Sequence, residues 1–255
     1  MGDIIFQALA QFFDFAGQSG IVRIIIVILV LAGYWRGLQR AGADGAERVF
    51  AWLAVAAPLI LWFAFIWSVA ADGVFDPRPG ARPWLPLAIF APPLVGLIAL
   101  TRSARVAGAL DAIPAHWLVG LQVYRVFGAA FLVQLALGHF SPTIALPAGI
   151  GDVVVGLLAA PAALYLRANP QRGRALAIAW NVLGIADLRL AVALGTAIQI
   201  AGLRGAAGAP ANAILYPLVM IPAFAVPLSL ILHGMSIWQL RRAALAPSGR
   251  TAAVA

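Results

Sequence analysis

Residues 20–38 read GIVRIIIVILVLAGYWRGL, and all eight residues from Ile24 to Leu31 carry branched aliphatic side chains. The hydrocarbon core of a membrane is about 30 Å thick, so a helix needs about 20 mostly apolar residues to cross it. Tyr34 and Trp35 end the apolar run and Arg36 follows, an order typical of the membrane–water interface. This stretch therefore predicts a transmembrane helix.

Further apolar stretches of similar length follow it along the chain. The chain has 255 residues, of which 63% are hydrophobic and 10% charged, whereas soluble proteins carry about 25% charged residues. We expect an all-α integral membrane protein, a bundle of seven transmembrane helices in one domain over residues 1–242, with a disordered cytoplasmic tail over 243–255. The expected spans are about 20–38, 49–70, 84–102, 115–138, 145–166, 175–198 and 213–238.

The segment before the first span has a different pattern. Its polar residues recur at steps of three and four, while apolar side chains cover the rest of the surface. Residues 3–17 are therefore expected to form an N-terminal amphipathic helix lying in the interface; the alternative is a long first helix that runs straight into the membrane. The polar stripe consists of Asp3, Gln7, Gln11, Asp14 and Gln18.

The distribution of arginine predicts the orientation. Loops that face the cytoplasm carry an excess of positive charge, and one set of loops and ends holds 11 arginines whereas the other set holds 3. We therefore expect an N-terminus outside and a C-terminus in the cytoplasm, in a cell membrane of the bacterial inner-membrane kind. The richer set is Arg36, Arg40, Arg48, Arg102, Arg105, Arg167, Arg172, Arg174, Arg241, Arg242 and Arg250, and the poorer set is Arg78, Arg82 and Arg204.

Composition excludes several chemistries. The chain has no cysteine, which excludes disulfides, iron–sulfur clusters and thiolate zinc sites. All 17 basic residues are arginine, so no lysine is present to form a Schiff base with retinal or pyridoxal phosphate. The net charge of +8 sits mostly in short loops, where it indicates contact with anionic lipid and not with nucleic acid. Membrane lipids are thus the expected partners, and no metal site is expected.

Four charged residues stand clearly inside the expected spans, away from their ends: Arg125, Asp152, Asp187 and Arg189. A charge at mid-membrane costs at least ~3 kcal/mol on insertion scales, so each needs a partner or water. At 1.5 Å per residue, Arg125 and Asp187 lie roughly 15 and 18 Å from the cytoplasmic ends of their helices. Similar depths predict the pairs Arg125–Asp187 and Asp152–Arg189, with the sixth span lying between the fourth and the fifth.

Amides and small residues surround these charges. Gln122 lies one turn before Arg125, and Asn181 lies near Asp187 along the sixth span. One interpretation is a set of buried salt bridges that fixes helix register; the other, which we favour, is a polar cavity, because buried ion pairs contribute little to stability by themselves. The candidate residues for binding a solute or an ion are Gln122, Arg125, Asp152, Asn181, Asp187 and Arg189.

The prolines of the seventh span and two of the histidines also carry structural predictions. Pro217, Pro222 and Pro227 fall five residues apart, so the seventh span is expected to be bent. His116 and His233 lie toward the cytoplasmic side and could ligate a b-type haem between helices. We otherwise expect no cofactor.

These observations favour a carrier or channel-like protein for a small polar solute or a proton. A membrane-embedded enzyme acting on a lipid or isoprenoid, with Asp152 or Asp187 as proton donor, is the second hypothesis. A non-catalytic membrane subunit is the third. The sequence identifies neither a catalytic residue nor the solute, and it leaves the oligomeric state open.

Overall fold

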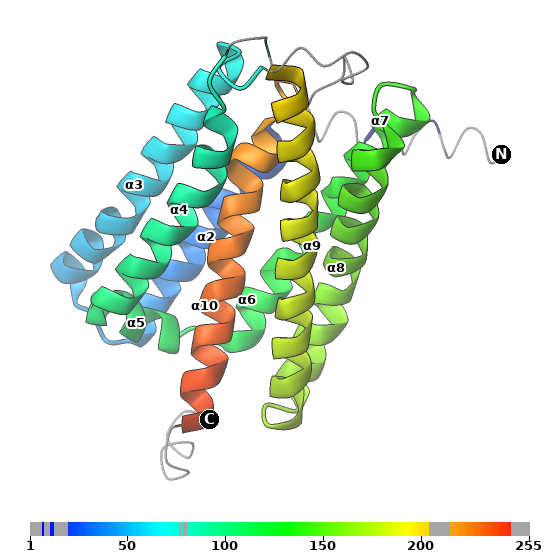
Figure 1. The fold of residues 1–255 in the computed structure, drawn as a ribbon. Helices are drawn as coiled ribbons and strands as arrows, with labels where there is room; N and C mark the ends of the chain where they lie inside the picture. Colours follow the sequence, from blue (N-terminus) through cyan, green and yellow to red (C-terminus); the bar gives the residue numbers. More distant parts are fainter. Residues whose placement is uncertain are drawn as a thin grey trace.

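A computed structural model of the chain describes residues 7, 11–12, 20–76, 78, 81–203 and 215–245. The described part is a bundle of long helices without strands, as Figure 1 shows. The expected all-α membrane bundle is thus confirmed. The predicted amphipathic helix over 3–17 lies almost wholly outside the described residues.

The helices of the first six predicted spans follow them closely, whereas the helix of the seventh extends further toward the C-terminus; the labels are those of Figure 1. The fourth span is divided into α6, a 3-10 segment η1 and α7, and the seventh begins with a short π-helix, η2. The elements are α2 (Ile21–Arg40), α3 (Gly45–Ala71), α4 (Trp84–Arg102), α5 (Ala104–Asp111), α6 (Ala115–Leu121), η1 (Gln122–Gly128), α7 (Ala129–Ala136), α8 (Pro142–Ala168), α9 (Arg172–Leu203), η2 (Ile221–Ala225) and α10 (Val226–Leu245).

Six of the described helical units are long and apolar enough to cross a membrane. A seventh is counted when α4 and α5, which meet at an angle of 89°, are taken as one broken span. The predicted third span is therefore a helix followed by a sharp bend, where Ser103 accepts a hydrogen bond from the backbone of Val106 and caps α5. The last helix continues to Leu245, so residues 243–245 belong to α10 and not to the expected tail, of which 246–255 lie outside the described residues.

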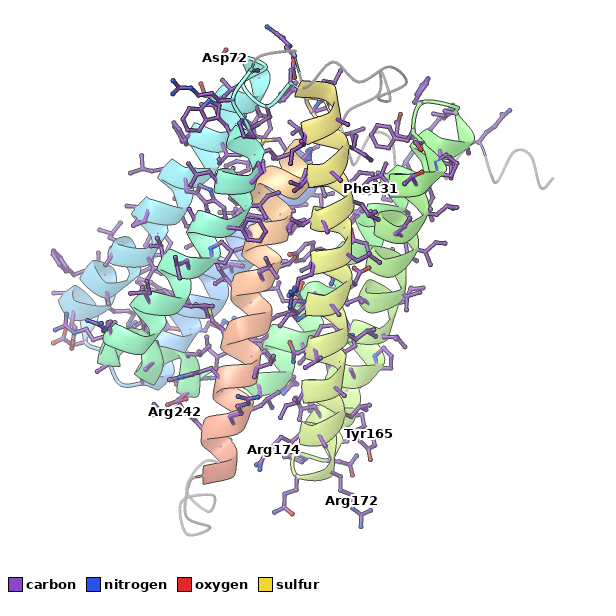
Figure 2. The ribbon with its side chains drawn as sticks, in the orientation of Figure 1. Asp72, Phe131, Tyr165, Arg172, Arg174 and Arg242 are labelled. Atoms are coloured by element: carbon purple, nitrogen blue, oxygen red, sulfur yellow. The ribbon has the colours of Figure 1, made fainter. Side chains whose placement is uncertain are left out.

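Three arginines of the richer set lie at one end of the described bundle (Figure 2). Figure 2 shows Arg172, Arg174 and Arg242 at the same end of the bundle, and Asp72 at the other end. Arg242 pairs with Asp111 at 2.9 Å, and Arg174 donates to the carbonyl oxygen of Ala243. One end of the described bundle is therefore rich in arginine.

Helix packing differs from the prediction at one point. We expected the sixth span between the fourth and the fifth, but α8, the fifth, lies between the fourth span and α9. The reason is the row of small residues on α8. A Cβ at Gly156 would lie 2.6 Å from the backbone nitrogen of Val126, so only glycine allows η1 to approach this closely. The fourth span therefore packs on α8, and α9 packs on α8 and α10.

The two irregular segments both lie within spans. In η1 the backbone is wound as a 3-10 helix between α6 and α7, and such a stretch within a longer helix often marks a functional hinge or a strained sequence. In η2 the backbone is π-helical and includes Pro222, which has no N–H to donate to a regular α-helix. The seventh span, which was expected to be bent, thus contains a π-helical turn before α10.

Candidate functional site

Arg125, in the middle of η1, contacts both buried aspartates. Its Nε donates to Asp152 Oδ1 at 2.7 Å, and its Nη2 lies 2.6 Å from the same oxygen. Nη2 also donates to Asp187 Oδ2. The three side chains are only 2%, 13% and 11% exposed, in the order Arg125, Asp152 and Asp187. We call these three residues the charged triad.

The predicted contact between Arg125 and Asp187 is therefore present, but the predicted pairing of Asp152 with Arg189 is wrong. Arg189 is exposed on the surface of α9 and forms an ion pair with none of the described carboxylates. Asp187 and Arg189 point in different directions because residues two apart lie about 200° apart around a helix. Arg189 is thus not part of the site.

The charges of the triad do not balance. One guanidinium faces two carboxylates, which gives a net charge of −1 when both are ionised. Asp152 uses Oδ1 and Asp187 uses Oδ2 to contact Arg125. A buried excess charge is costly in a membrane, so binding of a proton or a small cation would stabilise the triad.

A row of neutral side chains lies against the other face of Arg125. Its Nη1 lies 3.4 Å from His233 Nε2 and donates to the carbonyl of Gly184 at 3.3 Å. Since a guanidinium cannot accept, Nε2 must be the acceptor and the imidazole proton is on Nδ1. That nitrogen donates to Asn181 Oδ1 at 2.8 Å, and Asn181 Nδ2 donates to Ser236 Oγ at 3.0 Å. The contacts thus assign His233 as a neutral imidazole of one tautomer.

Glycines make room for these groups. A Cβ at Gly151 would overlap the carboxylate of Asp187, and a Cβ at Gly128 would overlap the side chain of Asp152. A Cβ at Gly184 would lie 2.5 Å from His233 Nε2 and 3.2 Å from Arg125 Nη1. The site therefore exists because these three helix positions carry no side chain.

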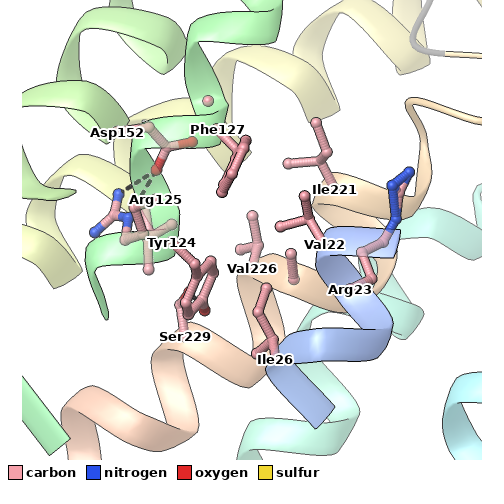
Figure 3. Close-up of a pocket in the computed structure, with 13 residues that line it drawn as sticks. Val22, Arg23, Ile26, Tyr124, Arg125, Phe127, Asp152, Ile221, Val226 and Ser229 are labelled. Carbon is pink, nitrogen blue, oxygen red and sulfur yellow. Dashed lines mark hydrogen bonds and ion pairs between the residues drawn. The ribbon is translucent and has the colours of Figure 1, made fainter. Parts of the chain in front are cut away.

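A small cavity of about 50 Å³ adjoins Arg125 and Asp152 of the triad (Figure 3). A water needs roughly 10–15 Å³ of such volume, so the cavity has room for a few waters or a small ion. Asp152 and Arg125 line it from α8 and η1, and Tyr124 lines it beside Ser229. The hydroxyls of Tyr124 and Ser229 are hydrogen-bonded to each other. The remaining wall includes Ile221 and Ala225 of η2, so both irregular segments border the same cavity.

The other predicted site residues are buried near the triad. Gln122 and Asn181 are 0% and 1% exposed, and Gln122 Nε2 donates to the carbonyl of Ser229 at 3.3 Å. The structure thus brings together five of the six candidates and leaves out Arg189. Ser229, His233 and Ser236 also belong to the site and were not predicted there, although their spacing of four and three along one helix could have indicated a shared face.

The two histidines do not fit the axial ligands of a haem. Both ring nitrogens of His233 are in hydrogen-bonding contact with Asn181 and Arg125, and the Trp180 ring packs against its imidazole at 5.2 Å. His116 is partly buried near the start of α6. Among the described residues, no group of three or more histidines and carboxylates could hold a metal ion.

The chain belongs to the family described as "Domain of unknown function (DUF8737)", whose profile matches residues 82–241. The matched segment includes the charged triad and the whole row from Asn181 to Ser236. No curated protein and no solved structure matches the chain.

Proposed function

We propose that this family member transfers protons across the membrane, alone or together with a small polar solute, and that the charged triad is the transport site. The observation that carries the proposal is a triad with one carboxylate in excess, held inside a membrane bundle, of which Arg125 and Asp152 border a cavity. Ionisable residues inside membrane spans mark proton relays and solute pathways in many transporters.

The helix geometry supports the same function. Transporters commonly place their binding sites near the membrane midplane, where discontinuous helices offer backbone groups to the ligand. Here the cavity lies between a 3-10 segment and a π-helical turn. Arg125 connects these parts because it contacts α8, α9 and α10 from η1. Occupation of the triad can thereby change the packing of four spans at once.

We further propose that the protein lies in a bacterial inner membrane with its N-terminus outside and its C-terminus in the cytoplasm. The support is the excess of arginine in one set of loops and at one end of the described bundle. In this orientation the triad lies near mid-membrane.

Proton flux into vesicles tests the proposal. The purified protein is reconstituted into liposomes that contain a pH-sensitive dye, and a potassium diffusion potential drives the flux. Asp187→Asn keeps the size of the side chain but removes the excess negative charge, so it should abolish the flux. Asp76→Asn is the matched control, since Asp76 pairs with exposed Arg78 outside the bundle core. Normal flux in Asp187→Asn would disprove the role of the triad.

The lipid-enzyme hypothesis receives less support from the described residues. An apolar cavity of about 410 Å³ lies between α3 and α4, where a lipid chain could enter. Its lining, which includes Trp62, Phe65 and Trp84, has no ionisable side chain. Of the two aspartates that could act as acids, Asp152 borders a different cavity, and neither of them lines this one. We therefore rank the enzyme second.

A further inference from the structure

A row of polar residues extends along one face of α10, away from the triad. Ser229, His233, Ser236 and Gln239 are spaced by four, three and three residues, which places them on one side of the helix. They are 2%, 0%, 1% and 6% exposed, so the row is buried inside the bundle. We call these four residues the polar seam.

The seam joins the cavity to the arginine-rich end of the bundle. Ser229 lines the cavity, whereas Gln239 Nε2 donates to the carbonyls of Leu110 and Ile113 at 2.7 and 2.5 Å, at the end of α5. Ten residues of helix correspond to about 15 Å. That length is half of a hydrocarbon core of about 30 Å. The seam thus has the length needed to reach from mid-membrane to the interface.

Two buried acceptors along this route have no hydrogen-bond partner among the described residues. They are Oε1 of Gln122, which contacts the seam at Ser229, and Oε1 of Gln239 at its far end. Gln122 and Gln239 are 0% and 6% exposed. Buried acceptors are nearly always satisfied, and ordered water satisfies those without protein partners. Both positions therefore point to water inside the bundle.

We propose that the polar seam is a water-filled proton path between the charged triad and the arginine-rich end of the bundle. Only O–H bonds of water and of a triad carboxylic acid form and break along it, and each proton that leaves one oxygen is taken up by the next. His233 stays neutral in this path and holds Arg125 in place, since its Nε2 accepts from that guanidinium. That the path carries protons rests on the proposed function, whereas the presence of water in the path does not depend on that function.

The absence of cysteine allows a direct test of the water content. Ser229→Cys and Ser236→Cys place a thiol of similar size in the seam. Leu228→Cys and Leu232→Cys are matched controls on the same helix, each at a site that is 3% exposed and packed in the apolar core. The probe is silver ion added to the folded protein in liposomes. Unreacted thiols are then alkylated after unfolding and counted by mass spectrometry.

We expect silver to block alkylation at both serine positions under conditions that leave both leucine positions fully alkylated. Equal reaction at all four positions, or no reaction at the serine positions, would overturn the proposal. The proton flux of the unmodified protein in vesicles tests the proton-transfer function separately from the water path. Silver reaction without flux leaves the water path and removes the proton-transfer function, whereas flux without silver reaction removes the water path alone.

Discussion

At the scale of single residues, Arg125 should determine stability more than any other charged side chain inside the bundle. Its removal leaves two buried carboxylates without a counter-charge, and breaking a buried pair costs about 3–5 kcal/mol. Arg125→Ala should therefore lower the free energy of unfolding by that amount in mixed detergent micelles. Arg189→Ala, at an exposed site on α9, should stay within about 0.5 kcal/mol of the unmodified protein.

The same stability measurement shows whether Arg125 has one aspartate partner or two. Because both aspartates contact Arg125, Asp187→Asn alone should rescue Arg125→Ala only in part. Addition of Asp152→Asn should restore more of the lost stability. A triple variant that is no more stable than Arg125→Ala would contradict the triad.

The sequence predicts part of this site. Depth along regular helices is enough to pair Arg125 with Asp187, because both lie near mid-membrane. The second contact of Arg125 is not predictable in this way, since the 3-10 winding of η1 changes the directions of its side chains. His233 appeared interfacial because the seventh span was expected to end near residue 238. As α10 continues to Leu245, His233 lies about 18 Å from its end and can reach Arg125.

At the scale of elements, close contact between α8 and α9 depends on glycine. In Gly151→Ala the new methyl group would overlap the carboxylate of Asp187 and displace it from Arg125. Overpacking of this kind typically costs about 1–3 kcal/mol, and proton flux should fall together with stability. Gly33→Ala is the control, because a Cβ there meets nothing within 4 Å and alanine favours a helix. Full activity of Gly151→Ala in the vesicle assay would contradict this arrangement.

The helices themselves were largely predictable, and their irregularities were not. Long apolar runs bounded by aromatic residues and arginine locate the spans because the membrane fixes their length. A 3-10 segment differs from an α-helix by a small change in winding, for which residues 122–128 give no clear signal. The order of packing depends on which small residues face which neighbour, and this cannot be read from a single helix.

At the scale of the whole molecule, the arginine count predicts which side each loop faces. Ala41 and Ala81 are exposed residues that follow α2 and precede α4, so they should lie on opposite sides of the membrane. In intact cells, a membrane-impermeant maleimide should label Ala81→Cys, and it should label Ala41→Cys only after the membrane is permeabilised. The reverse pattern would invert the proposed orientation.

The central claim is that the charged triad makes this bundle a path for protons. The measurement that tests it most directly is the initial rate of proton entry into vesicles, compared between the unmodified protein, the double variant Asp152→Asn/Asp187→Asn and protein-free liposomes of the same lipid. We predict fast entry with the unmodified protein and a rate at the protein-free level with the double variant, in which no ionisable carboxylate remains beside Arg125. Equal rates in all three preparations would contradict the account.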